Sequence, residues 1–256
     1  MAKLKKEELL LRLEDAYSRH SKPDFIPHDP IQIPHRFSKK EDIEIAGFLA
    51  ATIAWGKRKT IINNAHRMIE SMDNAPYDFI VNHKASDRKR FEGFVHRTFN
   101  EIDAMFFTEA LQHLYLNVQG LEGAFIAKPG VDAKERISHF HQQFFSIEHL
   151  PRTTKHVSNP AKGSSAKRLN MYLRWMVRPN KEGIDFGIWQ HMKPAELMMP
   201  LDVHTSTIGR KLGLISSKQD DWKAVEELTT ALRQFDPEDP VKYDFALFGM
   251  GANKEL

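Results

Sequence analysis

The chain has 256 residues and a formal net charge of +3 at pH 7, with 37 Lys and Arg against 34 Asp and Glu. That length can bury a substantial core, as one domain or as two lobes. The chain contains no cysteine, which excludes disulfides, thiolate zinc sites and cysteine-ligated iron–sulfur clusters. No apolar run reaches the roughly 18 residues of a membrane span, and the charged N-terminus is unlike a secretory signal. We therefore expect a cytoplasmic protein.

Helical spacing of apolar residues dominates the first part of the chain. Ser38, with Glu41 three residues later, predicts a capping box at the start of a nearly all-apolar helix that should be buried. The segment 21–37 contains four prolines and predicts an extended connector, because proline lacks a backbone donor and restricts the residue before it. Helices are predicted over 5–19, 43–55, 60–72, 100–118 and 133–149.

The second part of the chain continues the helical pattern. Gly213 ends the helix that Asp202 opens, since glycine commonly terminates helices. Strand-like alternation, internal repeats and low-complexity segments do not stand out in this sequence. The chain therefore predicts an all-α fold. Further helices are predicted over 165–178, near 194–199, from 202 to about 213, over 219–235 and at the start of the tail at 240.

The helix 165–178 carries a basic stripe. At about 100° per residue, Lys167, Arg174 and Arg178 fall on one side, opposite an apolar side. The stripe contains no acidic residue, and backbone N–H groups at the Gly/Ser-rich junction before it suit phosphate oxygens. A solvated surface face is the alternative for such a stripe. The residues expected to contact nucleic acid are Lys162, Gly163, Ser164, Ser165, Arg168, Arg174, Arg178 and His204.

Lys167 and Asp202 are the candidate catalytic residues. A lysine amine is nucleophilic only when neutral, a form that neighbouring cations and partial burial favour. Asp202 follows a Pro-Leu pair and precedes Thr205, which predicts a helix N-cap. If the same carboxylate faces a cleft, it can also stabilise an oxocarbenium ion or take up protons. Capping alone is the alternative role.

The block PLDVHTSTIGRKLGL, residues 200–214, is similar to the segment that carries the catalytic aspartate in the helix-hairpin-helix (HhH-GPD) DNA glycosylase superfamily. Asp202 occupies the aspartate position, and the helix 43–55 resembles the first helix of the core of that fold. The whole chain is similar to an uncharacterised bacterial family, DUF2400. That family resembles the archaeal 8-oxoguanine glycosylase branch, in which lysine and aspartate are widely spaced, as Lys167 and Asp202 are here.

The resemblance implies a two-lobed, all-α glycosylase-like unit over 1–256, with a cleft between the lobes. One lobe would be 38–200, and the other 1–37 plus 201–256. The implied protein is a monomeric, nucleoid-associated DNA repair glycosylase. It would bind double-stranded DNA, flip out a damaged base and excise it through Lys167 and Asp202, with possible lyase activity.

Two tryptophans are candidates for the base pocket. Trp55, at the end of the helix 43–55, and Trp175 are placed to stack on an extruded base, although tryptophans at helical spacing are more often core residues. His139 and His141 lie on different faces of one helix, so we expect no metal site, and nothing in the sequence calls for a cofactor.

Two alternatives remain open on sequence grounds. The superfamily's Leu-Pro-Gly-x-Gly hairpin is absent, and HLPRTTKHVSNPAKGSSAK occupies its place. This favours a non-catalytic nucleic-acid-binding protein that retains the glycosylase fold. An enzyme that acts on a small phosphorylated molecule would use the same cationic residues.

Overall fold

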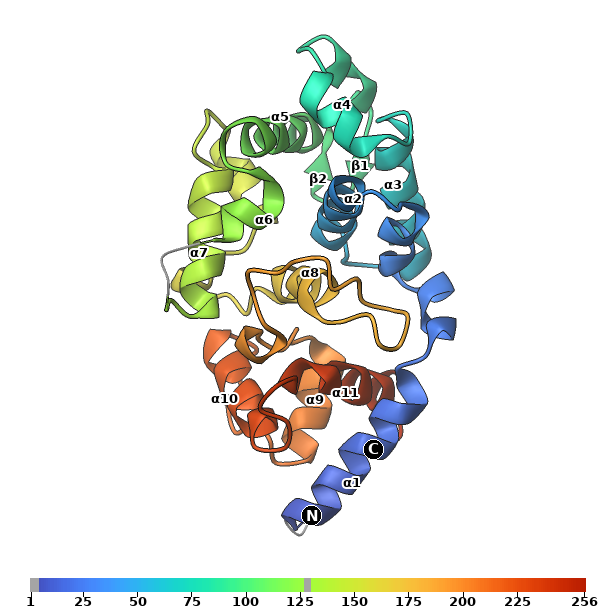
Figure 1. Ribbon diagram of the computed structural model, residues 1–256, viewed down its shortest axis with the longest axis vertical. Helices are drawn as coiled ribbons and strands as arrows, with labels where there is room; N and C mark the ends of the chain where they lie inside the picture. The colour runs from blue at the N-terminus through green and yellow to red at the C-terminus, as the bar shows by residue number, and fades with distance from the viewer. Residues whose placement is uncertain (1–4, 127–129) are drawn as a thin grey trace. The chain divides into compact units, whose positions relative to one another are not determined.

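The computed structural model describes residues 5–126 and 130–256 (Figure 1). These residues are mostly helical, which confirms the all-α expectation apart from one short β hairpin. The chain divides into two compact units: Met1–Phe25 with Asn159–Leu256, called the terminal unit, and Ile26–Ser158, called the central unit. The borders differ from the 37/38 and 200/201 borders expected from the sequence. The helix that begins at Lys167 therefore belongs to the terminal unit, where Arg174 pairs with Asp244 of the C-terminal segment.

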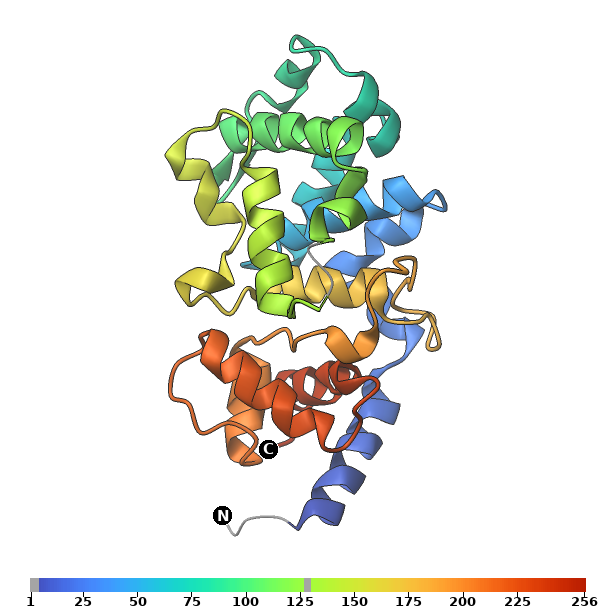
Figure 2. The ribbon, with the colours of Figure 1, turned by 60° about the vertical axis from the view of Figure 1, so that its left-hand side comes forward.

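The terminal unit contains five α-helices among its described residues. Helix α11 packs against both α1 and α9, and Figures 1 and 2 show α11 beside α9 from two sides. A Cβ at Gly249 would lie 2.2 Å from the His20 ring, so glycine is what allows α11 to approach α1 closely. The elements are α1 (Lys6–His20), η6 (Pro160–Lys162), α8 (Lys167–Val177), η7 (Pro194–Glu196), α9 (Val203–Lys211), α10 (Trp222–Arg233), η8 (Pro240–Lys242) and α11 (Tyr243–Ala252).

The central unit is built around α2, which is buried on nearly every side, as its apolar sequence predicts. Phe48 of α2 packs against Phe107 and Phe140, so aromatic rings fill much of this core. The elements are η2 (Pro30–Gln32), η3 (Pro34–Arg36), α2 (Lys40–Thr52), α3 (Arg58–Glu70), α4 (Pro76–Asn82), η4 (Asp87–Phe91), β1 (Val95–His96), β2 (Phe99–Asn100), α5 (Glu101–Asn117), α6 (Gly120–Phe125), α7 (Ala133–Phe144) and η5 (Pro151–His156).

The proline-containing connector differs from its prediction. Instead of an extended segment, it forms η1 (Pro23–His28), η2 and η3. Each of these short 3₁₀ helices begins with a proline. The first N–H group of a helix has no acceptor within the helix, so proline, which lacks that group, costs nothing there. The predicted capping box at Ser38 is also wrong, because α2 begins at Lys40 with Lys39 as its N-cap and without a side-chain cap.

Candidate active site

Lys167 and Asp202 lie together in the terminal unit. Lys167 is the first residue of α8, and Asp202 is the N-cap of α9. The Lys167 Nζ lies 3.4 Å from the Asp202 Oδ2, while the Asp202 Oδ1 accepts a hydrogen bond of 2.8 Å from the Thr205 N–H. The lysine side chain is 36% exposed and the aspartate side chain 13%. One carboxylate thus caps a helix and pairs with an amine that solvent can reach.

The approach to α8 has an unusual backbone. Ala166, the N-cap of α8, has a φ of 47° and provides no side-chain cap, while its own N–H donates a hydrogen bond of 3.2 Å to the Ser164 Oγ. The Gly163 carbonyl accepts a hydrogen bond of 3.0 Å from the Trp222 N–H, which ties this approach to the start of α10. Lys162 and Gly163 are exposed. Ser164 and Ser165 are partly exposed. These four residues therefore lie where an anion can approach the helix start.

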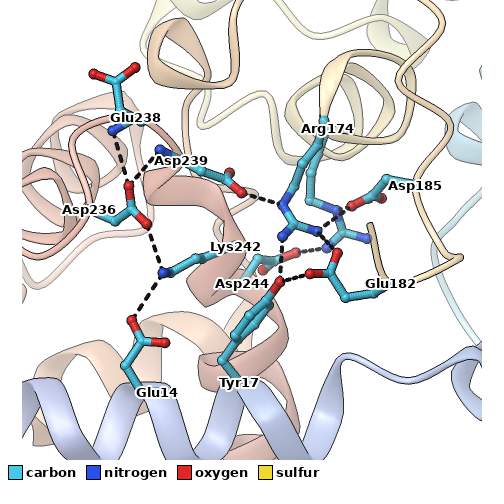
Figure 3. A network of polar contacts seen from close by, with 11 residues as sticks. Glu14, Tyr17, Arg174, Glu182, Asp185, Asp236, Glu238, Asp239, Lys242 and Asp244 are labelled. Atoms are coloured by element: carbon cyan, nitrogen blue, oxygen red, sulfur yellow. Dashed lines mark hydrogen bonds and ion pairs between the residues drawn. The ribbon is translucent and has the colours of Figure 1, made fainter. Parts of the chain in front are cut away.

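Arg174 and Arg178 are buried, with 4% and 1% of their surfaces exposed. Arg174 Nε lies 3.3 Å from Asp185 Oδ1, and its Nη1 also pairs with Asp244 (Figure 3). Arg178 Nη1 lies 3.1 Å from Asp185 Oδ2, and its Nε lies 2.8 Å from Asp239 Oδ2. The prediction of an unbalanced basic stripe is therefore wrong, since carboxylates from the loop after α8 and from the C-terminal segment balance it. Neither arginine is available to a phosphate.

Asp244 is a component of this site that the sequence did not reveal. It lies in the first turn of α11 and pairs with Arg174. Burial raises the pKa of Asp244 to about 6; Arg174 and Lys167 oppose this rise, and the charge of Asp202 adds to it. A carboxyl that exchanges its proton near neutral pH thus lies within electrostatic range of the Lys167–Asp202 pair. Its only signal in the sequence is an acidic residue within the apolar tail segment.

The charged cluster continues to the N-terminal helix. The Arg178 Nη2 donates a hydrogen bond of 2.6 Å to the Tyr17 hydroxyl, which in turn donates to Glu182. Burial and the Glu182 carboxylate raise the pKa of Tyr17, so it stays a neutral donor. Lys242 Nζ lies 3.0 Å from Glu14 Oε1, which ties α1 to the C-terminal segment as well (Figure 3). The network therefore holds α1 against the helices that carry the site.

Arg168 and His204 are the remaining predicted nucleic-acid contacts. Arg168 follows Lys167 in α8 and is partly exposed; burial lowers its pKa to about 10, so it stays charged at neutral pH. His204 is exposed, and its ring lies 5.6 Å from the Phe248 ring. Both side chains lie close in sequence to the Lys167–Asp202 pair, on the first turns of α8 and α9.

The two base-pocket candidates have different environments. Trp175 is 0% exposed and packs in the core of the terminal unit, so its predicted role in stacking on a base is wrong. An apolar residue on the inner side of an amphipathic helix is buried by the helix's own packing. Trp55 is partly exposed and belongs to the central unit. Its ring contacts the rings of His96 and His156.

Two further properties bear on the class of protein. Over residues 5–126 and 130–256, the structure has no helix that combines the length and apolar character needed to cross a membrane. In the same described residues, no three His, Asp or Glu side chains are grouped as metal ligands would be.

Comparisons with known proteins point to one family. Neither a search of curated proteins nor a search of solved structures found a match. A family model described as a protein of unknown function, DUF2400, matches residues 29–253. Because that match spans most of the chain, the protein belongs to the DUF2400 family.

Proposed function

We propose that the protein is a DNA repair glycosylase with lyase activity, of the two-lobed helix-hairpin-helix (HhH-GPD) type, related to the archaeal 8-oxoguanine branch. The observation that carries the proposal is the 3.4 Å separation of Lys167 Nζ and Asp202 Oδ2 at the starts of two helices. A partly exposed amine beside a carboxylate is the pair that imine chemistry on a sugar requires. The protein would act as a cytoplasmic, nucleoid-associated monomer on a damaged base in duplex DNA.

The two side chains have complementary roles in this chemistry. The lysine ammonium first gives a proton to a base, and Asp202 is the carboxylate within reach. The neutral amine then attacks C1′ of the deoxyribose, and the bond from C1′ to the base breaks. The base leaves with the bonding electrons and takes up the proton that Asp202 received, which restores the carboxylate. Asp202 stabilises the positive charge that develops on the sugar. The C1′–O4′ bond then breaks, O4′ takes up a proton and the nitrogen loses its excess protons to Asp202 and solvent, which gives the imine. Loss of a C2′ proton to a base, with departure of the 3′ phosphate and the electrons of the C3′–O bond, cleaves the strand.

Phosphate binding falls to the approach to α8 in this proposal. Arg174 and Arg178 are buried, which leaves Lys162, Arg168 and His204 as the side chains. The start of α8, where Ala166 gives no side-chain cap, adds the favourable end of the helix dipole. Contacts of this kind position DNA without reading its sequence.

The decisive test is trapping of the imine with borohydride. Duplexes that carry 8-oxoguanine, uracil or an abasic site are incubated with the protein, and covalent complexes are resolved by electrophoresis. We expect a cross-link with at least one of them and none with Lys167→Gln. Lys162→Gln is the matched control, because it removes a nearby lysine and should weaken binding without abolishing the cross-link.

Asp202→Asn separates the chemical role of this residue from its structural role. Asparagine caps helices as well as aspartate does, so the hydrogen bond to the Thr205 N–H is retained while the charge is lost. We expect a folded variant with a much slower cross-link. If wild-type protein forms no cross-link with any of the three duplexes, the proposed chemistry is wrong.

A nucleic-acid-binding protein without catalysis is the second candidate. The same ion pair favours it, because Lys167 and Asp202 also tie α8 to α9 as a structural contact would. It predicts binding that weakens with salt and is unchanged in Asp202→Asn, together with the absence of any borohydride cross-link.

A further inference from the structure

The central unit carries a marked asymmetry of charge. Segments 53–60, 95–99 and 150–158 contain Lys and Arg but no Asp or Glu. Most of these cations are exposed, so their charges face solvent. The basic residues of the three segments are Lys57, Arg58, Lys59, Arg97, Arg152 and Lys155.

Hydrogen bonds and ring contacts join these three segments into one surface. The His96 Nε2 lies 3.1 Å from the Trp55 carbonyl oxygen, which links the first segment to the hairpin of β1 and β2. The Arg152 Nη2 donates a hydrogen bond of 3.1 Å to the Thr98 carbonyl, which links that hairpin to η5. A Cβ at Gly56 would lie 3.1 Å from the guanidinium of Arg97. We call these three joined segments the basic surface.

Trp55 lies within the basic surface. Its ring centroid is 4.9 Å from that of His96, edge to face, and 6.0 Å from that of His156, nearly parallel. His96 is held by Asn64 at 2.9 Å, and His156 Nε2 lies 3.2 Å from Asp103 Oδ2. The indole is therefore held in a fixed orientation by two anchored rings.

The carboxylate behind His156 is itself well anchored. Asp103 is fully buried and also accepts hydrogen bonds from Arg152 and Thr153. Burial alone would raise its pKa, but hydrogen bonds from His156, the Asn100 N–H and Thr153 lower the pKa to about 2. Its charge is thus used internally, where it pairs with Arg152 at 2.8 Å, while Lys57, Arg97 and Lys155 are exposed to solvent.

The exposure of Trp55 sets it apart from the other tryptophans. Trp175, Trp189 and Trp222 are 0%, 2% and 3% exposed, whereas Trp55 is partly open to solvent. A rigid, accessible aromatic ring among exposed cations is the arrangement by which proteins bind single-stranded nucleic acid, with bases on the ring and phosphates on the cations.

We propose that the basic surface binds single-stranded DNA, with one base stacked on the Trp55 indole and the flanking phosphates on Lys57, Arg97 and Lys155. An acidic peptide would satisfy the cations but would leave the indole without a planar partner. The inference goes beyond the proposed function, since it needs neither Lys167 nor Asp202, which belong to the terminal unit.

Tryptophan fluorescence tests the proposal, because Trp55 is the accessible tryptophan. A short oligothymidylate is titrated into the full chain, and its effect is compared with that of an abasic oligonucleotide of equal length and of polyglutamate. We expect the oligothymidylate to quench the emission and the abasic strand to bind more weakly without quenching. Polyglutamate should neither bind measurably nor quench the emission. Trp55→Phe should abolish the quenching, whereas Trp189→Phe should not.

Binding constants provide a second measurement. Loss of base stacking in Trp55→Ala should weaken binding of the oligothymidylate by about 5- to 150-fold, and Trp55→Phe should weaken it less. Lys155→Gln should lower the salt dependence of binding, while Lys218→Gln, which removes an exposed lysine of the terminal unit, should leave it unchanged. Trp55→Phe keeps an aromatic ring in place, so the test survives if Trp55→Ala fails to fold.

The outcomes separate this inference from the proposed function. Quenching that persists in Lys167→Gln, with or without a borohydride cross-link in wild type, supports the binding surface. If the abasic strand or polyglutamate binds as tightly as the oligothymidylate, the surface recognises charge alone and stacking on Trp55 is wrong. The proposal is also overturned if the oligothymidylate leaves the fluorescence unchanged.

Discussion

Arg174→Met tests the electrostatics of the terminal unit. The arginine pairs with Asp185 at 3.3 Å and with Asp244, and its guanidinium carbon lies 4.3 Å from the Phe245 ring centroid. Methionine keeps most of the packing of the arginine stem, so the substitution mainly removes the charge and its hydrogen bonds. Removal of one partner from a buried ion pair costs about 3–5 kcal/mol when the other charge stays uncompensated.

Each carboxylate limits that cost in a different way. Asp244 has a pKa of about 6 with Arg174 present, so protonation at neutral pH costs only about 1.4 kcal/mol, the energy of one pH unit. Asp185 keeps Arg178 at 3.1 Å and loses one charge-assisted hydrogen bond of about 1.5–3 kcal/mol. We expect Arg174→Met to lower the free energy of unfolding by about 3–4 kcal/mol at neutral pH.

The pH dependence identifies the carboxyl involved. In wild type, Asp244 is mostly protonated one pH unit below its pKa of about 6. Removal of Arg174 therefore leaves little negative charge uncompensated at that pH. The cost of Arg174→Met should therefore fall by about 1.4 kcal/mol between about pH 7 and pH 5. Urea unfolding of wild type, Arg174→Met, Asp244→Asn and the double variant at both pH values measures this coupling.

Two results would refute the reasoning. If Arg174→Met costs as much at acidic as at neutral pH, Asp244 is not the group that responds to the loss of the cation. If the variant is as stable as wild type but binds DNA more weakly and with a smaller salt dependence, Arg174 contacts phosphate. The buried network would then be wrong.

Three further substitutions follow from the same contacts. The pKa of Asp244 in the folded protein, about 6, lies above its ordinary value of 3.8, so its ionisation destabilises the fold as pH rises. The free energy of unfolding of Asp244→Asn, relative to that of wild type, should therefore increase by up to about 3 kcal/mol from about pH 4 to pH 7. A difference in urea unfolding that does not change with pH would contradict this. The pKa of Asp103 in the folded protein, about 2, lies below its ordinary value of 3.8. Asp103→Asn should therefore lower the free energy of unfolding by about 2 kcal/mol at neutral pH and by little near pH 2. An equal loss at both pH values would rule out the charge of Asp103 as its cause. Gly249→Ala should lower the thermal midpoint, with a cost of about 1–3 kcal/mol, because the added Cβ would lie 2.2 Å from the His20 ring; an unchanged midpoint would show that α1 does not pack closely on α11.

The sequence predicts the helices well where apolar spacing is regular. The helices expected over 5–19 and 100–118 appear as α1 and α5 with ends shifted by one residue, since one-sided burial alone determines such elements. The segment 21–37 could not be predicted by the same reasoning. Proline is compatible both with an extended chain and with the first position of a short helix, and the choice depends on tertiary packing.

The candidate site was only partly visible in the sequence. Lys167 and Asp202 could be paired because the resemblance gives the aspartate a role and because their spacing along the chain suits the archaeal branch. Asp185 and Asp244 could not be linked to Arg174 in advance, because they lie on other segments and meet it only in the folded chain. A helical stripe shows which side chains share a face, whereas the sign of the charges opposite that face is a property of the tertiary structure.

The position of Asp244 bears on the choice between an active site and a structural tie. An ion pair between Lys167 and Asp202 is enough to join α8 to α9, and such a tie needs no third carboxyl near it. Asp244 is nevertheless buried close enough for its pKa of about 6 to respond to both charges, and its ionisation destabilises the fold. Buried groups whose pKa values are shifted toward neutral pH are concentrated at functional sites. This arrangement supports the catalytic role that we propose for the pair, which Lys167→Gln and Asp202→Asn test.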